Sequence, residues 1–176
     1  MAVDTFLKIC VKCKRKFVQL QAGEAQTFVE EVCTMLPTII NELEAHQVNG
    51  FYEGVGNMVS AHPDEGAREA LTERLMLLPN SVWSRLMRGA AEDITSLQNV
   101  DVLRDVQRVL RINEAACRSI GATFAKQLGR LYLDMLNVYK AVSNVLASAV
   151  ATSGDGIMQT QLARLMTGVK RQVLAL

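Results

Sequence analysis

The stretch Thr123–Ser153, TFAKQLGRLYLDMLNVYKAVSNVLASAVATS, decides the fold class, because it contains no proline and only one internal glycine. Its apolar residues recur at steps of three and four, which is the period of one helix face. At 1.5 Å per residue a helix over this stretch would be roughly 46 Å long. Periodic runs beyond about 25 residues are typical of coiled coils, membrane spans and helical repeats. Charged side chains interrupt this run too often for a membrane span.

The composition agrees with an all-α protein that buries a substantial core. Of the 176 residues 49% are hydrophobic, 5% are aromatic and three are prolines. Alanine, leucine, methionine, arginine and glutamate favour helices. No run of residues has the alternation and flanking turn signals of a strand. We therefore expect an all-α fold.

Helical periodicity divides the chain into segments joined by short loops. We expect helices over about 2–20, 24–43, 46–61, 63–78, 100–120 and 123–153. Another helix is expected to begin after a cap at Asn80 or Ser81, and the last is expected to run from about residue 157 to the last residue. Antiparallel pairs of such helices recur about every 45 residues, the period of HEAT and armadillo arrays. The expected organisation is one array with repeats at 1–45, 46–98 and 99–154, and the first helix of a fourth repeat at 155–176.

Glycine and proline mark the expected irregularities. Pro37 lies inside a helical segment and predicts a kink or a break there. Gly121 predicts a left-handed helix stop. Gly50, Gly54 and Gly56 share one helix, where each costs about 1 kcal/mol relative to alanine, so close packing against a neighbouring helix is the expected compensation.

The two ends of the chain and its cysteines suggest an intracellular context. Met1 leads directly into an amphipathic helix and no apolar run reaches the ~18 residues of a membrane helix, so we expect a soluble protein without a leader. Four cysteines within helical patterns suggest a reducing compartment. The last helix has no polar cap, as the end of a natural array would, and we expect a fragment of a longer protein.

Charge is distributed unevenly although the net charge is only +1. Residues 24–73 contain ten acidic residues and one basic residue, Arg68. Such a block is either a set of solvated helix faces or a surface for a basic partner. The candidate partner surface consists of Glu42, Glu44, Glu53, Asp64, Glu65, Glu69 and Glu73.

Motifs for chemistry are weak, and we expect no catalytic, metal or cofactor site. Cys10-x-x-Cys13 has no second ligand pair, and both cysteines fall on the apolar stripe of the first helix, so core packing is expected. His46 and His62 are expected at the surface or at helix caps. Trp83 is expected to anchor a helix pair. A basic stripe on the first helix is expected to be solvated rather than bound to nucleic acid; it comprises Lys8, Lys12, Arg15 and Lys16.

Several sequence blocks, in order along the chain, resemble one protein family. They are DTF with KI and CKR near residues 4–15, FYE with VG at 51–56, MLLPN with VW at 76–83, QLGRLYLDMLNVYK at 127–140 and VKR at 169–171. These blocks resemble the major nuclear exportins, the chromosomal region maintenance family of the importin-beta superfamily. Between them, notably over 61–71 and 87–104, the sequence departs from the vertebrate pattern.

The resemblance implies more than periodicity does. It implies an α-solenoid of HEAT-type antiparallel helix pairs, part of a receptor that carries leucine-rich export-signal cargo with Ran-GTP. Such a receptor meets nucleoporins, shuttles between nucleus and cytoplasm, and contacts neither nucleic acid nor membrane directly. The family's signal groove and reactive cysteine lie upstream of this segment, so neither role is assigned to Cys10, Cys13, Cys33 or Cys117. The segment itself is expected to be structural and partner-binding.

Two other functions remain open on the residues alone. A HEAT-repeat scaffold of another complex, of the phosphatase-scaffold or importin type, would have the same periodicity. An all-α enzyme would need converging titratable groups, for which the sequence offers two histidines and scattered carboxylates.

Overall fold

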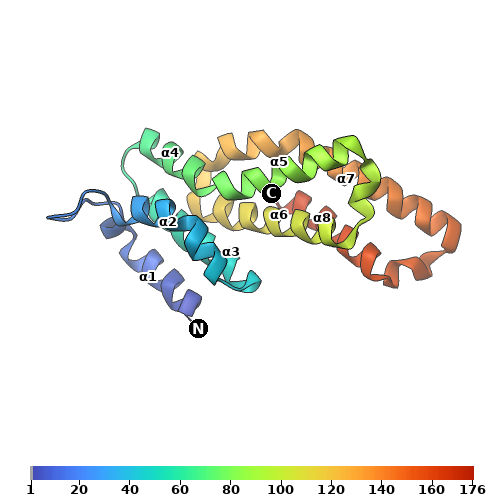
Figure 1. Cartoon of the computed structure of the whole chain (residues 1–176), viewed down its shortest axis with the longest axis horizontal. Coiled ribbons are helices and arrows are strands. Elements are labelled where there is room, and N and C mark those ends of the chain that lie inside the picture. The colour runs from blue at the N-terminus through green and yellow to red at the C-terminus, as the bar shows by residue number, and fades with distance from the viewer. Residues whose placement is uncertain (1) are drawn as a thin grey trace. The chain divides into compact units, whose positions relative to one another are not determined.

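The computed structural model describes residues 2–176 and confirms the all-α class of helical repeats. Every regular element in these residues is helical (Figure 1). The elements are α1 (Ala2–Phe17), α2 (Phe28–Glu42), α3 (Ala45–Ser60), α4 (Glu65–Leu75), α5 (Leu77–Glu92), η1 (Ile94–Gln98), α6 (Val100–Ile120), η2 (Gly121–Phe124), α7 (Ala125–Ser153), η3 (Asp155–Gln159) and α8 (Gln161–Ala175).

The chain forms two compact units. The first contains the residues up to Leu78 together with Ala115–Gln127, and the second contains Pro79–Glu114 and Leu128–Leu176. The unit boundaries fall inside α5, α6 and α7, so each of these three helices has residues in both units. The expected repeat boundaries at 45, 98 and 154 remain a prediction.

In the first unit α3 is the central helix, and it contacts α1, α2 and α4. Its glycines permit a very close approach. A Cβ atom at Gly54 would lie 2.8 Å from Phe6 Cε1 and 3.1 Å from Cys10 Sγ, and one at Gly50 would lie 2.9 Å from Val3 Cγ1. Real Cβ atoms do not approach other atoms this closely, so α1 fits against α3 only because these positions lack a side chain.

A third glycine of α3 meets a different helix. A Cβ atom at Gly56 would lie 2.0 Å from Ser119 Oγ, near the end of α6. Close packing therefore compensates for the glycines of this helix, as their number within one helix predicts. Phe6 and Phe51 extend the α1–α3 contact, with stacked rings whose centroids are 5.3 Å apart.

Polar side chains attach α4 to its neighbours in the first unit. Arg74 Nη2 donates to Thr34 Oγ1 on α2 at 2.8 Å. Arg68 Nη1 donates to the carbonyl oxygen of His62 at 2.7 Å, which closes the turn before α4. Arg68 Nε also donates to Thr123 Oγ1 in η2 at 3.4 Å. These bonds position α4, which carries part of the acidic candidate surface.

The second unit is built around the stripe on α7 that the opening sequence predicts. Leu131, Met135, Val142 and Leu146 are buried in one apolar cluster with residues of α5, α6 and α8. Tyr132, which has the same helical spacing as these residues, is 53% exposed.

Trp83 anchors a helix pair, as predicted. Its side chain is only 2% exposed and lies in the apolar cluster of the second unit. The indole Nε1 donates to Asp134 Oδ2 on α7 at 3.1 Å. A buried indole N–H without a partner would be costly, and this bond removes that cost while it joins α5 to α7.

Helix ends differ from the sequence expectations where side chains cap the backbone. α2 begins at Phe28 rather than near residue 24, because the backbone N–H of Thr27 donates to Glu30 Oε2 at 2.8 Å in a capping box. α8 begins at Gln161 rather than near 157, because Thr160 Oγ1 accepts from the N–H of Ala163 at 3.3 Å. Gly121 has φ +78°, which confirms the predicted left-handed stop.

Two predictions about helix boundaries near prolines were incomplete or wrong. α2 continues through Pro37, so the break that was one of two alternatives does not occur. α5 begins at Leu77, so the cap expected at Asn80 or Ser81 was wrong. Pro79 lies in the first turn of α5, where the backbone N–H has no partner within the helix and its loss costs nothing.

We predict that Gly54→Ala destabilises the protein and that Gly129→Ala does not. A methyl group at residue 54 collides with Phe6, and overpacking of this kind costs about 1–3 kcal/mol. Gly129 lies in α7 with open space around it, so alanine there should stabilise by up to about 1 kcal/mol. Urea unfolding followed by circular dichroism measures both changes. Equal stability of the two variants would contradict the close α1–α3 contact.

Candidate interaction surface

The seven acidic residues of the candidate partner surface do not form one patch. Glu44 is the N-cap of α3, and Asp64 is the N-cap of α4 after α3 has ended. The 16 residues of α3 therefore separate them, a length of roughly 24 Å at 1.5 Å per residue. Glu42, the last residue of α2, lies near Glu44 in sequence and is exposed. The structure thus keeps these two apart from the acidic residues of α4.

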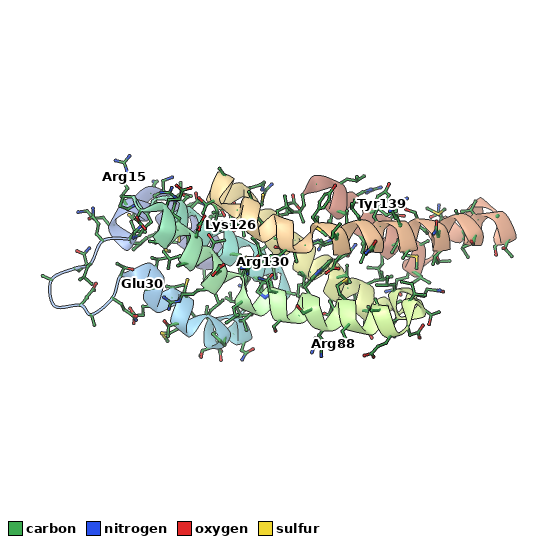
Figure 2. The ribbon with its side chains drawn as sticks, turned by 90° about the horizontal axis from the view of Figure 1, so that it is seen from above. Arg15, Glu30, Arg88, Lys126, Arg130 and Tyr139 are labelled. Carbon is green, nitrogen blue, oxygen red and sulfur yellow. The ribbon has the colours of Figure 1, made fainter. Side chains whose placement is uncertain are left out.

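A continuous acidic stripe lies on α4. Glu65, Glu69 and Glu73 are spaced by four residues and therefore lie on one side of the helix. Glu65 and Glu73 are exposed. Glu69 accepts a hydrogen bond from Lys126 Nζ, whose side chain is labelled in Figure 2. We call Asp64, Glu65, Glu69 and Glu73 the α4 acidic stripe.

Other members of the acidic set also have structural partners. Asp64 Oδ2 accepts a hydrogen bond from the backbone N–H of Ala67 at 2.6 Å and so caps α4. Glu53 is half-buried on α3, and its Oε2 lies 3.9 Å from Arg118 Nη2. These contacts use part of the acidic charge inside the first unit, whereas the side chains of Glu65 and Glu73 are exposed.

The cysteines divide between core and surface. Cys10 is buried, as predicted, and Cys33 is buried as well; burial raises the pKa of the Cys10 thiol to about 12 and that of Cys33 to about 11. Cys13 is exposed, so its predicted core role was wrong. Val3, Phe6 and Cys10 are the residues of α1 that approach the glycines of α3. Among the side chains that the structure describes, no three of His, Cys, Asp or Glu gather as a metal site.

Both histidines lie at helix boundaries, as predicted. His46, in the first turn of α3, is exposed, and its Nδ1 lies 3.3 Å from Glu44 Oε2. His62 lies in the turn before α4, where its Nδ1 accepts from the backbone N–H of Asp64 at 3.2 Å. Each histidine therefore has a local role at a helix start, and neither converges with a nucleophile.

The basic stripe of α1 is solvated in this structure. Lys8, Lys12, Arg15 and Lys16 are all exposed, and Arg15 extends away from the ribbon in Figure 2. Aromatic side chains do not alternate with these bases, and such alternation is a usual feature of single-stranded nucleic-acid sites. None of the helices described is both long and apolar enough to cross a bilayer.

Sequence reasoning missed an apolar groove in the first unit. It has a volume of ≈ 410 Å³ and lies between α1, α2 and α3, with Phe6, Phe28, Met35 and Phe51 among its lining residues. Phe28 is 39% exposed and Met35 49% exposed. Both are apolar residues at helical spacing in α2, and periodicity alone does not distinguish a buried apolar side chain from one that lines an open groove.

Comparison with known proteins identifies relatives along the whole chain. Residues 127–176 match the family described as CRM1 C terminal. Over all 176 residues the chain is 42% identical to Exportin-1 of Drosophila melanogaster and to Protein EXPORTIN 1B of Arabidopsis thaliana, and 38% identical to Exportin-1 of Schizosaccharomyces pombe. The chain spans 17%, 16% and 16% of the lengths of these relatives.

We predict that Cys13 is alkylated well before Cys10 and Cys33 in the folded protein at pH 8. Cys13 is exposed, whereas the other two thiols are buried and remain protonated far above pH 8. Iodoacetamide labelling followed by peptide mass spectrometry gives the order, and labelling in denaturant provides the control in which all three react. Modification of Cys10 as fast as Cys13 in the folded protein would contradict the burial described above.

Proposed function

We propose that the chain forms part of a nuclear export receptor of the exportin-1 family, because it is 42% identical to Exportin-1 of Drosophila melanogaster along all 176 residues. In this proposal the receptor carries leucine-rich export-signal cargo out of the nucleus together with Ran-GTP, and it shuttles between nucleus and cytoplasm. The observation that carries the proposal is the similarity over the full chain to exportins of an insect, a plant and a yeast.

We propose that this segment provides structural support and a surface for partner binding, and that it does not catalyse a reaction. Helix pairs that contact mainly their neighbours allow an array to change curvature by small movements at each contact. Two ligands that both favour one curvature then bind cooperatively, because each shifts the same population. The glycine-mediated contact between α1 and α3 supports a stiff element here, since close-packed backbones have little freedom to slide.

Partner capture tests the proposed receptor role. We predict that the full-length receptor containing this segment recovers export-signal proteins from a cell extract only when GTP-locked Ran is added. Mass spectrometry of the bound proteins with and without GTP-locked Ran measures this dependence. A parallel experiment with GDP-bound Ran is the control. Recovery of phosphatase subunits, or of the same proteins in all conditions, would favour a scaffold of another kind.

We further propose that the acidic set is a partner surface and that the α4 acidic stripe is its main part. Glu65 and Glu73 are exposed on one side of α4, and Glu69 between them pairs with Lys126. A basic face of Ran or of folded cargo would gain from these charges over the distance of a Debye length, about 8 Å at physiological salt. Glu42 and Glu44 would form a separate contact at the other end of α3.

Charge reversal tests this surface. We predict that Glu65→Lys combined with Glu73→Lys weakens the binding of Ran-GTP or folded cargo to the full-length receptor about threefold to tenfold at low salt, and less at high salt. Glu24→Lys combined with Glu92→Lys changes the net charge equally at exposed positions outside the set and is the matched control. Isothermal titration calorimetry measures both. An equal effect of the two pairs, or no effect of either, would remove the surface from the proposal.

A further inference from the structure

A second, basic groove lies in the second unit, between α6 and α8. Its volume is ≈ 580 Å³, and the lining residues used below are Gln107, Arg111, Gln159, Gln161, Arg164 and Gly168. We call it the arginine groove. None of the residues that line it is acidic or aromatic. The residues of the acidic candidate surface all belong to the first unit.

Gln107 and Gly168 set the spacing of the two helices at the groove. A Cβ atom at residue 168 would lie 2.0 Å from Gln107 Nε2, so the glutamine amide occupies the space that a side chain would need. The same Nε2 donates to the carbonyl oxygen of Leu165 at 3.2 Å. This contact fixes the floor of the groove because it joins a side chain of α6 to the backbone of α8.

Both arginines of the groove are held by neutral amides. Arg164 Nη2 donates to Gln159 Oε1 at 2.9 Å. With the Gln172 amide oriented so that its oxygen faces α6, that oxygen accepts from Arg111 Nε at 2.6 Å. Among the residues that the structure describes, no carboxylate lies within ion-pair distance of either guanidinium. The two side chains are therefore oriented without being neutralised.

Orientation without neutralisation favours an anionic ligand. An arginine that is already fixed loses less side-chain entropy on binding, and its remaining N–H groups match a carboxylate in a two-point contact. Arg108, which follows Gln107 on α6, is also exposed and adds positive charge to the same helix. Arg104 is offset, because its Nη1 lies 3.0 Å from Asp101 Oδ1.

We propose that the arginine groove binds an acidic peptide segment. Two carboxylates of the segment contact Arg111 and Arg164, and the amides of Gln107 and Gln161 bond to its backbone. The absence of aromatic side chains among the lining residues disfavours single-stranded nucleic acid, which uses stacking platforms. This proposal concerns the chain's own surface and does not rest on the export function.

Fluorescence anisotropy with the 176-residue chain tests the proposal. The probe is a fluorescein-labelled peptide of alternating glutamate and serine, and its counterpart with glutamine in place of glutamate is the ligand control. We expect Arg111→Gln with Arg164→Gln to weaken binding of the acidic probe about tenfold or more, because the charged hydrogen bonds to the probe are lost. The pair Arg111→Lys and Arg164→Lys should weaken it less, because charge remains while the two-point contact is lost.

A matched control variant distinguishes specific binding in the arginine groove from nonspecific electrostatic attraction of the acidic probe. Arg85→Gln with Arg88→Gln removes the same charge from exposed positions of α5 outside the groove, and Arg88 points outward in Figure 2. This pair should leave the affinity within about twofold, because screened surface charges contribute little at a distance. Circular dichroism of each variant confirms folding, and the single variants replace the double one if it unfolds.

Three outcomes would overturn the proposal. The first is that the folded wild-type chain does not bind the acidic probe, or binds the glutamine probe equally well. The second is that the α5 control pair reduces affinity as much as the groove pair. The third is that a labelled single-stranded oligonucleotide binds more tightly than the peptide and is released by the same groove substitutions.

Discussion

The first unit depends on the close approach of α3 to its neighbours. Helices ordinarily pack with side chains between their backbones, at interaxial distances of 8–10 Å. At Gly50 and Gly54 no side chain intervenes, and Val3, Phe6 and Cys10 occupy that space instead. The entropic cost of glycine in a helix is offset by the contacts that its small size permits. The positions of α2 and α4 follow, because both also contact α3.

Polar bonds inside apolar contacts give the second unit its specific register. An apolar stripe allows a helix several rotations of similar energy, whereas a hydrogen bond between two named atoms allows one. Trp83 fixes α5 against α7 through Asp134, and Gln107 fixes α6 against α8 through the Leu165 carbonyl. Lys170 Nζ lies 5.1 Å from the centroid of the Tyr139 ring, which adds a contact between α7 and α8.

The charged side chains of the two candidate binding surfaces differ in their partners. On α4 an acidic side chain, Glu69, is paired with a base, so the stripe retains only part of its formal charge. In the arginine groove the cations are held by amide oxygens and keep their full charge. Formal charge counted along the sequence therefore overestimates the negative charge of the acidic stripe on α4. It also fails to reveal the arginine groove, because the groove lies in a region of the sequence with both acidic and basic residues.

The helical period of the sequence was sufficient to predict that these segments are helices. Which of their side chains are buried or exposed depends on the helices that lie beside them. The apolar spacing over 100–120 and 123–153 determined two long helices, because a 3.6-residue period is a property of consecutive residues. The three glycines of α3 predicted a close helix contact, because the free-energy cost of glycine in a helix must be offset by packing. Sequence did not say that Phe6 fills the space at Gly54, that Cys13 faces outward, or that Arg111 and Arg164 line one groove. These facts depend on which helices lie beside each other, and only tertiary packing brings residues so distant in sequence together.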